Sequence, residues 1–167
     1  MISPSPTSSS RQCRKVRSIR MTVQVRPIVD RDFFDWLGLW EGYSAFYGSE
    51  VTDTKALIVW SWLTDKAHEL SGYVAEDDGK LVGFAHVREY PRTLEADRAM
   101  FLDDLFVAED ARSHGVGGAL IEEAKRIARE RRAGAVTWIT AADNETAQRL
   151  YDNAGTRTSW VTYETEV

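Results

Sequence analysis

The sequence predicts a mixed α/β domain in which helices cover both faces of a central sheet. Segments with apolar residues at helical spacing and segments with alternating or β-branched residues follow one another in the order β-α-α-β-β-β-α-β-α-β. A hairpin turn between two early strands indicates antiparallel pairing, and a later strand-helix-strand unit indicates a parallel pair. We therefore expect an antiparallel front half beside a parallel β-α-β unit.

A short strand over residues 22–27 is expected to lead into two helices. Asp30 precedes the first helix, and a second helix through Leu63 is expected to be capped by one of residues 52–54, whose side chains suit an N-cap. We interpret the apolar stripe of the first helix as core. Its members at helical spacing are Phe33, Trp36, Leu37, Trp40, Tyr43 and Tyr47.

The period of the pattern then changes to that of strands. Residues 70–76 and 81–88 flank the turn 77–80, whose Asp-Gly pair tolerates the positive φ of a tight hairpin. Residues 101–107 form the next predicted strand. His86 shares a strand face with apolar residues, so we interpret it as a packed histidine.

The C-terminal part is predicted to contain two helices and two strands. A helix over residues 117–131 carries one apolar stripe and is ended by Gly134. A β-branched strand over 135–140, a short helix over 144–153 and a closing strand over 158–164 complete the expected order.

Residues 1–20 differ in composition from the rest of the chain. Ser and Pro dominate the first ten residues, and five basic residues follow without an acidic one. The segment lacks the apolar core of a secretory signal, and its composition would suit a transit peptide or a nucleic-acid arm. We expect a disordered, solvated tail or a start codon assigned too early, with Met21 as the true start. Residues 21–167 are expected to form one domain.

The charge of the predicted domain points away from nucleic acid. Without the tail, the chain has 16 basic and 26 acidic residues, whereas nucleic-acid binding relies on a basic face. This balance suits a cationic substrate, although an acidic surface also serves solubility alone.

The composition also argues against a metal site and a membrane span. The one cysteine, Cys13, lies in the tail, and the three histidines are scattered without ligand spacing, so we expect no metal. No apolar run approaches the roughly 18 to 20 residues that a membrane helix needs. We therefore expect a soluble, cytoplasmic protein with no membrane partner.

A glycine-rich RxxGxGG loop opens the helix predicted over residues 117–131. Such a loop directs main-chain N–H groups and the positive end of the helix dipole at an anion, which favours a pyrophosphate site; the alternative is a tight connection without a ligand. Ala119 and Leu120 do not fit a Walker loop, and Leu120 does not fit a dinucleotide fingerprint. The loop consists of Arg112, Ser113, His114, Gly115, Val116, Gly117 and Gly118.

Three features in this order resemble the GNAT superfamily of N-acetyltransferases. They are the acidic strand 102–107, the loop 112–118, and the segment 144–147 that leads through Tyr151 to Gly155. The final residues 158–163 resemble the branch that acetylates small amines, such as diamines, polyamines and amino acids, or histone tails. The resemblance implies acetyl-coenzyme A as co-substrate and an amine as acceptor. It also implies a homodimer that meets through the C-terminal strand.

The resemblance assigns the coenzyme to consecutive segments. The amides from Arg112 to Gly118 would hold the pyrophosphate, and the strand at Leu105, Phe106 and Val107 would pair with the pantetheine arm, which contains two amides and can imitate a strand. Asn144 would hydrogen-bond the same arm; alternatively it caps a helix, and one residue could do both.

Two catalytic roles follow from the same resemblance. Tyr151 would act as general acid toward the departing thiolate, chiefly by hydrogen bonding because a phenol is less acidic than a thiol; otherwise it is a half-buried packing residue. Asp103 would take a proton from the amine, directly or through water, while Asp104 is expected to face the other side of the sheet. The alternative is that one of the two aspartates pairs with an arginine.

We therefore expect an enzyme that moves an acetyl group from acetyl-coenzyme A to a primary amine by direct attack in a ternary complex. The acceptor would be a small cationic metabolite, an amino acid or a lysine side chain. The alternative is a non-catalytic coenzyme-A-binding sensor or interaction domain. Thr156 replaces the usual apolar residue after Gly155, which leaves the acceptor less certain than the coenzyme.

Overall fold

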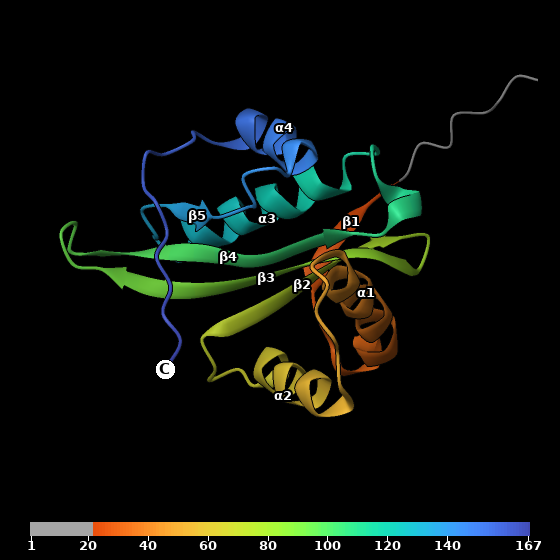
Figure 1. Cartoon of the computed structure of the whole chain (residues 1–167). Coiled ribbons are helices and arrows are strands. Elements are labelled where there is room, and N and C mark those ends of the chain that lie inside the picture. The colour runs from red at the N-terminus through yellow and green to blue at the C-terminus, as the bar shows by residue number, and fades with distance from the viewer. Residues whose placement is uncertain (1–21) are drawn as a thin grey trace, which may run out of the picture.

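The computed structural model describes residues 22–167, in which one five-stranded sheet is covered by helices on both faces (Figure 1). The sequence predictions for residues 1–20, and for Met21 as a start, lie outside the described residues. The strands follow one another across the sheet in chain order, from β1 to β5. The predicted fold class is confirmed.

The first four strands are antiparallel neighbours and the last pair is parallel. The turn between the second and third strands contains Asp78 and Gly79 with φ of 49° and 78°, as the Asp-Gly pair predicts. The parallel pair is short, from Met100 opposite Val136 to Leu102 opposite Trp138. The strands are β1 (Gln24–Pro27), β2 (Leu70–Asp77), β3 (Lys80–Arg92), β4 (Asp97–Val107) and β5 (Val136–Trp138).

Two helices pack on each face of the sheet, and each pair has its own hydrophobic core (Figure 1). On one face Trp36 and Phe84 are fully buried, and on the other Leu120 and Ile121 are. Helices α1 (Phe33–Phe46) and α2 (Asp53–Thr64) cover the first face, and α3 (Val116–Glu130) and α4 (Glu145–Ala154) cover the second. Two single 3₁₀ turns span Asp30–Asp32 and Glu109–Ala111.

The predicted helix start at residues 52–54 is confirmed in detail. Thr52 is the N-cap of α2, and its side chain accepts a hydrogen bond of 3.3 Å from the Lys55 amide. The predicted core stripe of α1 is confirmed for Trp36, which is fully buried, whereas Tyr47 at the end of the helix is 52% exposed. The last turn of α1 therefore extends past the core toward solvent.

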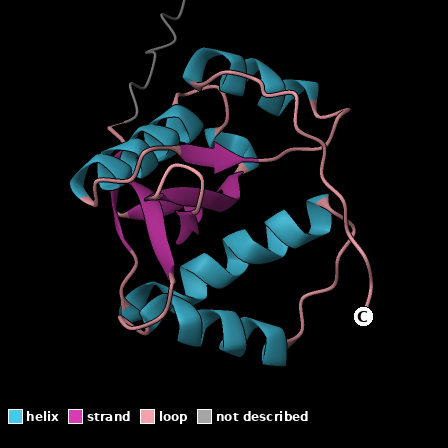
Figure 2. Ribbon diagram, turned by 90° about the vertical axis from the view of Figure 1, so that its left-hand side faces the viewer, coloured by secondary structure: helices cyan, strands magenta, loops and turns pink. Residues whose placement is uncertain are grey.

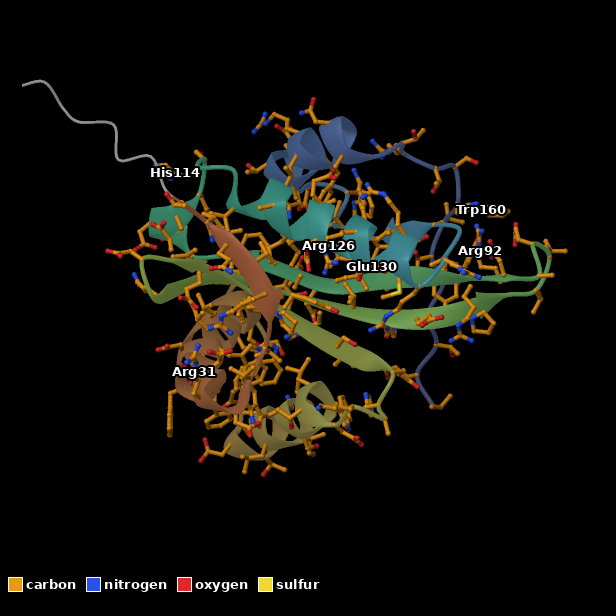
Figure 3. All side chains as sticks on the ribbon, turned by 180° about the vertical axis from the view of Figure 1, so that it is seen from behind. Arg31, Arg92, His114, Arg126, Glu130 and Trp160 are labelled. Atoms are coloured by element: carbon orange, nitrogen blue, oxygen red, sulfur yellow. The ribbon has the colours of Figure 1, made fainter. Side chains whose placement is uncertain are left out.

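The prediction of a closing strand over residues 158–164 is wrong, because the described structure has no strand there. The segment after α4 is extended but pairs with no described strand, and Figure 2 shows it as a loop apart from the sheet. Trp160 and Tyr163 are 89% and 90% exposed, and Trp160 is labelled on this segment in Figure 3. Alternation predicts only the tendency of a segment to extend, because a strand also needs a neighbour to hydrogen-bond.

Candidate active site

Strand β4 loses one of its two neighbours halfway along its length. β5 pairs with it only from Met100 to Leu102, whereas β3 accompanies it to Val107. Leu105, Phe106 and Val107, expected to receive the coenzyme arm, all lie beyond the last β5 pair. Among the described residues, the edge of β4 beyond Leu102 therefore has no strand partner on the β5 side, and we call this free edge the gap.

The glycine-rich loop leads from the C-terminal end of β4, where the gap lies, to the start of α3. Ser113 and Gly115 have φ of 65° and 85°, and Gly115 is the N-cap of α3. Within residues 22–167, no protein acceptor pairs with the main-chain N–H groups of residues 113–118. Unpaired amides at a helix start are free to donate to an anion, and the pyrophosphate site predicted from the loop pattern stays a prediction.

The individual side chains of the loop have distinct environments. Arg112 turns back and donates from Nε to the Val107 carbonyl at 3.2 Å, and Val116 is buried in the core. His114 is exposed at the outer side of the loop (Figure 3). A Cβ on Gly117 would lie 2.9 Å from Leu150 Cδ2, so this glycine also serves the close packing of α3 on α4.

Helix α4 presents both of its predicted site residues near the gap. Asn144 is the N-cap, and its Oδ1 accepts a hydrogen bond from the Ala147 amide at 3.2 Å. The capping alternative is thus confirmed, and the side-chain amino group remains for a further acceptor. Tyr151 packs against Trp138 with ring centroids 5.6 Å apart. Burial, and after it the neighbouring Tyr47, raises the pKa of the Tyr151 phenol.

Asp103 and Asp104 lie on the same cavity, which contradicts the prediction that Asp104 faces the other side of the sheet. His86 is opposite Asp104 while the next residue, Val87, is opposite Leu102, so Asp103 is the extra residue of a β-bulge. The bulge breaks the strict alternation of sides along β4. Both carboxylates therefore contribute to one cavity of about 510 Å³ on the α1 and α2 face.

The two aspartates have opposite electrostatic environments. Burial raises the pKa of Asp103, although Arg88 opposes this by donating from Nε to Asp103 Oδ1 at 2.9 Å. Asp103 Oδ2 is buried and has no hydrogen-bond partner in the described structure. For Asp104, burial works in the raising direction, but hydrogen bonds from His86 and Tyr43 lower its pKa overall. The alternative that one aspartate pairs with an arginine is therefore confirmed for Asp103.

Asp104 is the end of a chain of hydrogen bonds from Trp36 through His86, which we call the relay and which the sequence patterns do not indicate. The Trp36 indole N–H donates to His86 Nε2 at 3.0 Å, and His86 Nδ1 lies 2.9 Å from Asp104 Oδ2. Because an indole nitrogen can only donate, Nε2 is the acceptor and Nδ1 carries the proton toward Asp104. His86 is packed as predicted, but it also connects the α1 core to the cavity. Its one sequence signal is a histidine on an otherwise apolar strand face.

The remaining walls of the cavity are aromatic and polar. Burial, and then the Asp104 carboxylate, raises the pKa of Tyr43. Trp62 stacks on His68 with ring centroids 5.4 Å apart at the mouth formed by α2. The cavity thus combines flat apolar surfaces with several carboxylates. Its other lining residues include Trp40, Ser44, Tyr47, Glu69 and Leu70.

The part of the chain that contains the loop 112–118, the free edge of β4 and the cavity also matches a family model. Residues 36–155 match the model of the acetyltransferase (GNAT) family. The chain belongs to the GNAT family of acetyltransferases. As a GNAT protein it is an acetyl-coenzyme A-dependent acyltransferase, and an amine is its acceptor.

Individual relatives agree with this membership. The chain is similar to the D-amino-acid N-acetyltransferase HPA3 of Saccharomyces cerevisiae, with 31% identity over 144 residues that cover 85% of this chain and 89% of the relative. A crystal structure of a probable acetyltransferase has 28% identity and a TM-score of 0.78, covering 86% of this chain and 97% of the other.

A more distant structure shares the fold alone. An aminoglycoside N-acetyltransferase, AAC(6')-Iy, was crystallised in complex with CoA; it has 20% identity and a TM-score of 0.75, covering 87% of this chain and 95% of the other.

No helix among residues 22–167 has the length and apolar character that crossing a membrane requires.

Proposed function

We propose that this GNAT protein transfers an acetyl group from acetyl-coenzyme A to the primary amine of a small cationic metabolite, an amino acid or a lysine side chain. Both substrates would be bound together, and the amine would attack directly. The observation that carries the proposal is the position of β4. One side of its free half opens to the unpaired loop amides and Tyr151, and the other side carries the two aspartates of the cavity.

The coenzyme would be held by main-chain groups along the gap. The loop 112–118, whose N–H groups from residue 113 onward have no protein acceptor in the described structure, suits the charge of a pyrophosphate, and the edge of β4 at Leu105, Phe106 and Val107 suits the two amides of pantetheine. Asn144 would add a hydrogen bond from its amino group while its Oδ1 caps α4. Bound in this way, the coenzyme supplies an activated acetyl thioester to the site.

The amine must lose a proton before it can attack. An alkylammonium group of pKa about 10.4 is only about one part in a thousand neutral at pH 7.4. Asp103 would accept that proton, directly or through water, and its raised pKa makes it a better acceptor than an ordinary aspartate. Asp104, held ionised by His86 and Tyr43, would attract the incoming cation.

The transfer itself needs one bond formed and one broken. The amine lone pair forms the new C–N bond to the acetyl carbon, and the C–S bond breaks with its electron pair on sulfur. Asp103 would pass the first ammonium proton to water and then take the second proton, which the nitrogen loses once the C–N bond has formed. Tyr151 would hydrogen-bond or protonate the departing thiolate and regain any proton it gives from water. The described residues contain no cysteine, and the one cysteine of the sequence, Cys13, is far from the motifs in the sequence, so direct attack needs no cysteine acyl-enzyme.

A thiol-release assay with purified protein tests the proposal. Acetyl-coenzyme A is offered with a panel of polyamines, L- and D-amino acids and basic peptides, and product is confirmed by mass. Tyr151→Phe should lower kcat by about tenfold to ten-thousandfold without changing coenzyme affinity. Tyr73→Phe, on β2 and outside the lining of the cavity, is the matched control.

Two outcomes would contradict the proposal. Unchanged turnover in Tyr151→Phe would remove the role assigned to the phenol. Coenzyme binding by calorimetry without thiol release from any amine would instead support the non-catalytic sensor.

We also propose that two copies assemble through the segment after α4. This segment is extended and carries exposed Trp160 and Tyr163, and pairing with a strand edge of a second copy would cover both. Light scattering at micromolar concentration should give twice the chain mass. A chain ending at Gly155 should give the monomer mass, and a monomer for the full chain would refute the assembly.

A further inference from the structure

We propose that the cavity binds an α-amino acid as a zwitterion, with the carboxylate on Arg88 and the amine on Asp103. This inference rests on the proposed acetyl transfer and narrows its acceptor. Arg88 would be the residue that determines specificity. It does not take part in the bond changes.

Arg88 lines the cavity and has hydrogen-bond donors that no described residue uses. Only its Nε is used, in the bond to Asp103 Oδ1, and its terminal N–H groups have no protein acceptor within residues 22–167. The guanidinium carbon of Arg88 lies over the Phe101 ring, 4.8 Å from its centre, which is a cation–π contact that stabilises its position. Arg88 is also the one arginine or lysine among the described residues that line the cavity. A substrate carboxylate would find two parallel donors there.

Asp103 lacks a partner on its other side. Its Oδ2 is buried without a hydrogen bond, but the side chain as a whole is 27% exposed and lines the cavity. The amine of a bound substrate would therefore approach the exposed part of the carboxylate, where Oδ1 accepts from Arg88 and has a second lone pair. Binding there would also place the amine on the group proposed to take its proton.

The Arg88–Asp103 pair is thus complementary to a zwitterion. An α-amino acid carries its ammonium and carboxylate on one carbon, so the two charges can face Asp103 and Arg88 side by side. A simple monoamine would leave the terminal donors of Arg88 unpaired, and a polyamine would bring a second cation toward them. A lysine within a peptide has no free carboxylate at this spacing.

The remainder of the cavity suits the rest of such a substrate. Trp40, Tyr43 and Trp62 supply flat apolar surfaces for a side chain. Asp104 and Glu69 leave the cavity net negative beside Arg88, which draws the ammonium end inward. These residues come from α1, α2, β3, β4 and the loop before β2, so the cavity forms only in the folded chain.

The experiment compares substrates that differ only in the carboxylate. Values of kcat/KM are measured for phenylalanine, alanine and lysine, each as both enantiomers and each against its carboxamide. Wild-type protein should prefer the free acid of at least one pair by tenfold or more, by an order-of-magnitude estimate for a charge-assisted hydrogen bond. In Arg88→Gln this preference should fall by about ten- to a hundredfold. Dividing the variant's ratio by the wild-type ratio cancels differences in amine basicity.

Arg98→Gln is the matched control, because Arg98 pairs with Glu89 and does not line the cavity. It should leave the ratio unchanged. Arg88→Lys keeps the charge but loses the planar fork, so it should retain part of the preference. A lower melting temperature does not affect the test, because the ratio is measured on the same folded molecules.

The possible failures are distinguishable. No thiol release from any amine would refute the proposed function. The carboxylate assignment would be overturned if wild-type protein used every carboxamide as well as, or better than, the matching free amino acid. It would also be overturned if the ratio of kcat/KM between free acid and carboxamide were the same in Arg88→Gln as in wild type. Acetyl transfer would stand in both cases.

Discussion

The two sides of β4 form their sites by different means. On the α3 and α4 side, the gap is made of main-chain groups from consecutive residues, namely the loop 112–118 and the free edge of β4. On the α1 and α2 side, the cavity is made of side chains from five separate helices and strands and from the loops between them. Main-chain groups suit a ligand shared by a whole family, whereas side chains can change the acceptor without disturbing the carrier.

The first prediction tests the cavity side and has the largest expected effect. Asp103→Asn should lower kcat/KM for every amine by about a hundredfold to ten-thousandfold, the range that a general base supplies. Coenzyme affinity, measured by calorimetry, should stay within error because the gap does not contain this side chain. A variant with wild-type turnover would exclude Asp103 as the proton acceptor.

Asp103 should limit stability even though it serves activity. Burial raises its pKa, so its bound proton stabilises the fold below the ordinary aspartate pKa, and this contribution is lost as the pH rises through the raised pKa. At neutral pH Asp103→Asn should therefore melt at the wild-type temperature or above it. A clearly lower melting temperature would contradict this.

The neighbouring aspartate provides the opposite case. Asp104→Asn should reduce the free energy of unfolding by about 1.5–3 kcal/mol at pH 7, because it removes a charged acceptor from His86. The lowered pKa of Asp104 means that its contribution is present above the ordinary aspartate pKa and is lost as the pH falls through the lowered value. In urea unfolding, the difference from wild type should shrink below pH about 4. A difference independent of pH would refute the relay.

A third prediction tests the main-chain side. Gly115→Ala should weaken coenzyme binding and the fold together, because φ of 85° costs a residue with a Cβ about 1–2 kcal/mol. A Cβ there would meet no atom within 4 Å, so the effect isolates the backbone. Calorimetry with coenzyme A and thermal melting measure the two effects. The preference among amines should not change; a changed preference would mean that the two sides are not separate.

The smallest expected effect comes from a matched glycine on the other face. Gly38 lies inside α1, and a Cβ there would also meet no atom within 4 Å. Gly38→Ala should stabilise the protein by about 0.5–1 kcal/mol through helix propensity, with no change in coenzyme affinity. Thermal melting measures the gain. A loss of stability would show that α1 needs backbone freedom at this position.

Sequence patterns predict the structure correctly where a feature depends on residues close together in the chain. The cap at Thr52, the Asp-Gly turn and the cap at Asn144 each depend on residues within a few positions, and all three are formed. The prediction of a closing strand over 158–164 is wrong, because the residue pattern of one segment does not show whether a neighbouring strand is present to hydrogen-bond with it. The side of the sheet predicted for Asp104 failed because one bulge residue shifts all that follow.

Consecutive residues carry the order of helices and strands up to the last helix, the glycine-rich helix start and the resemblance to the family, so the sequence alone predicts them. The shared cavity of Asp103 and Asp104, the pairing of Arg88 with the first, and the hydrogen bonds from Trp36 through His86 to the second arise in the tertiary structure. The partners in these contacts are 15 to 50 residues apart in the chain. Their meeting depends on strand register and helix packing, which the whole fold sets and no local pattern encodes.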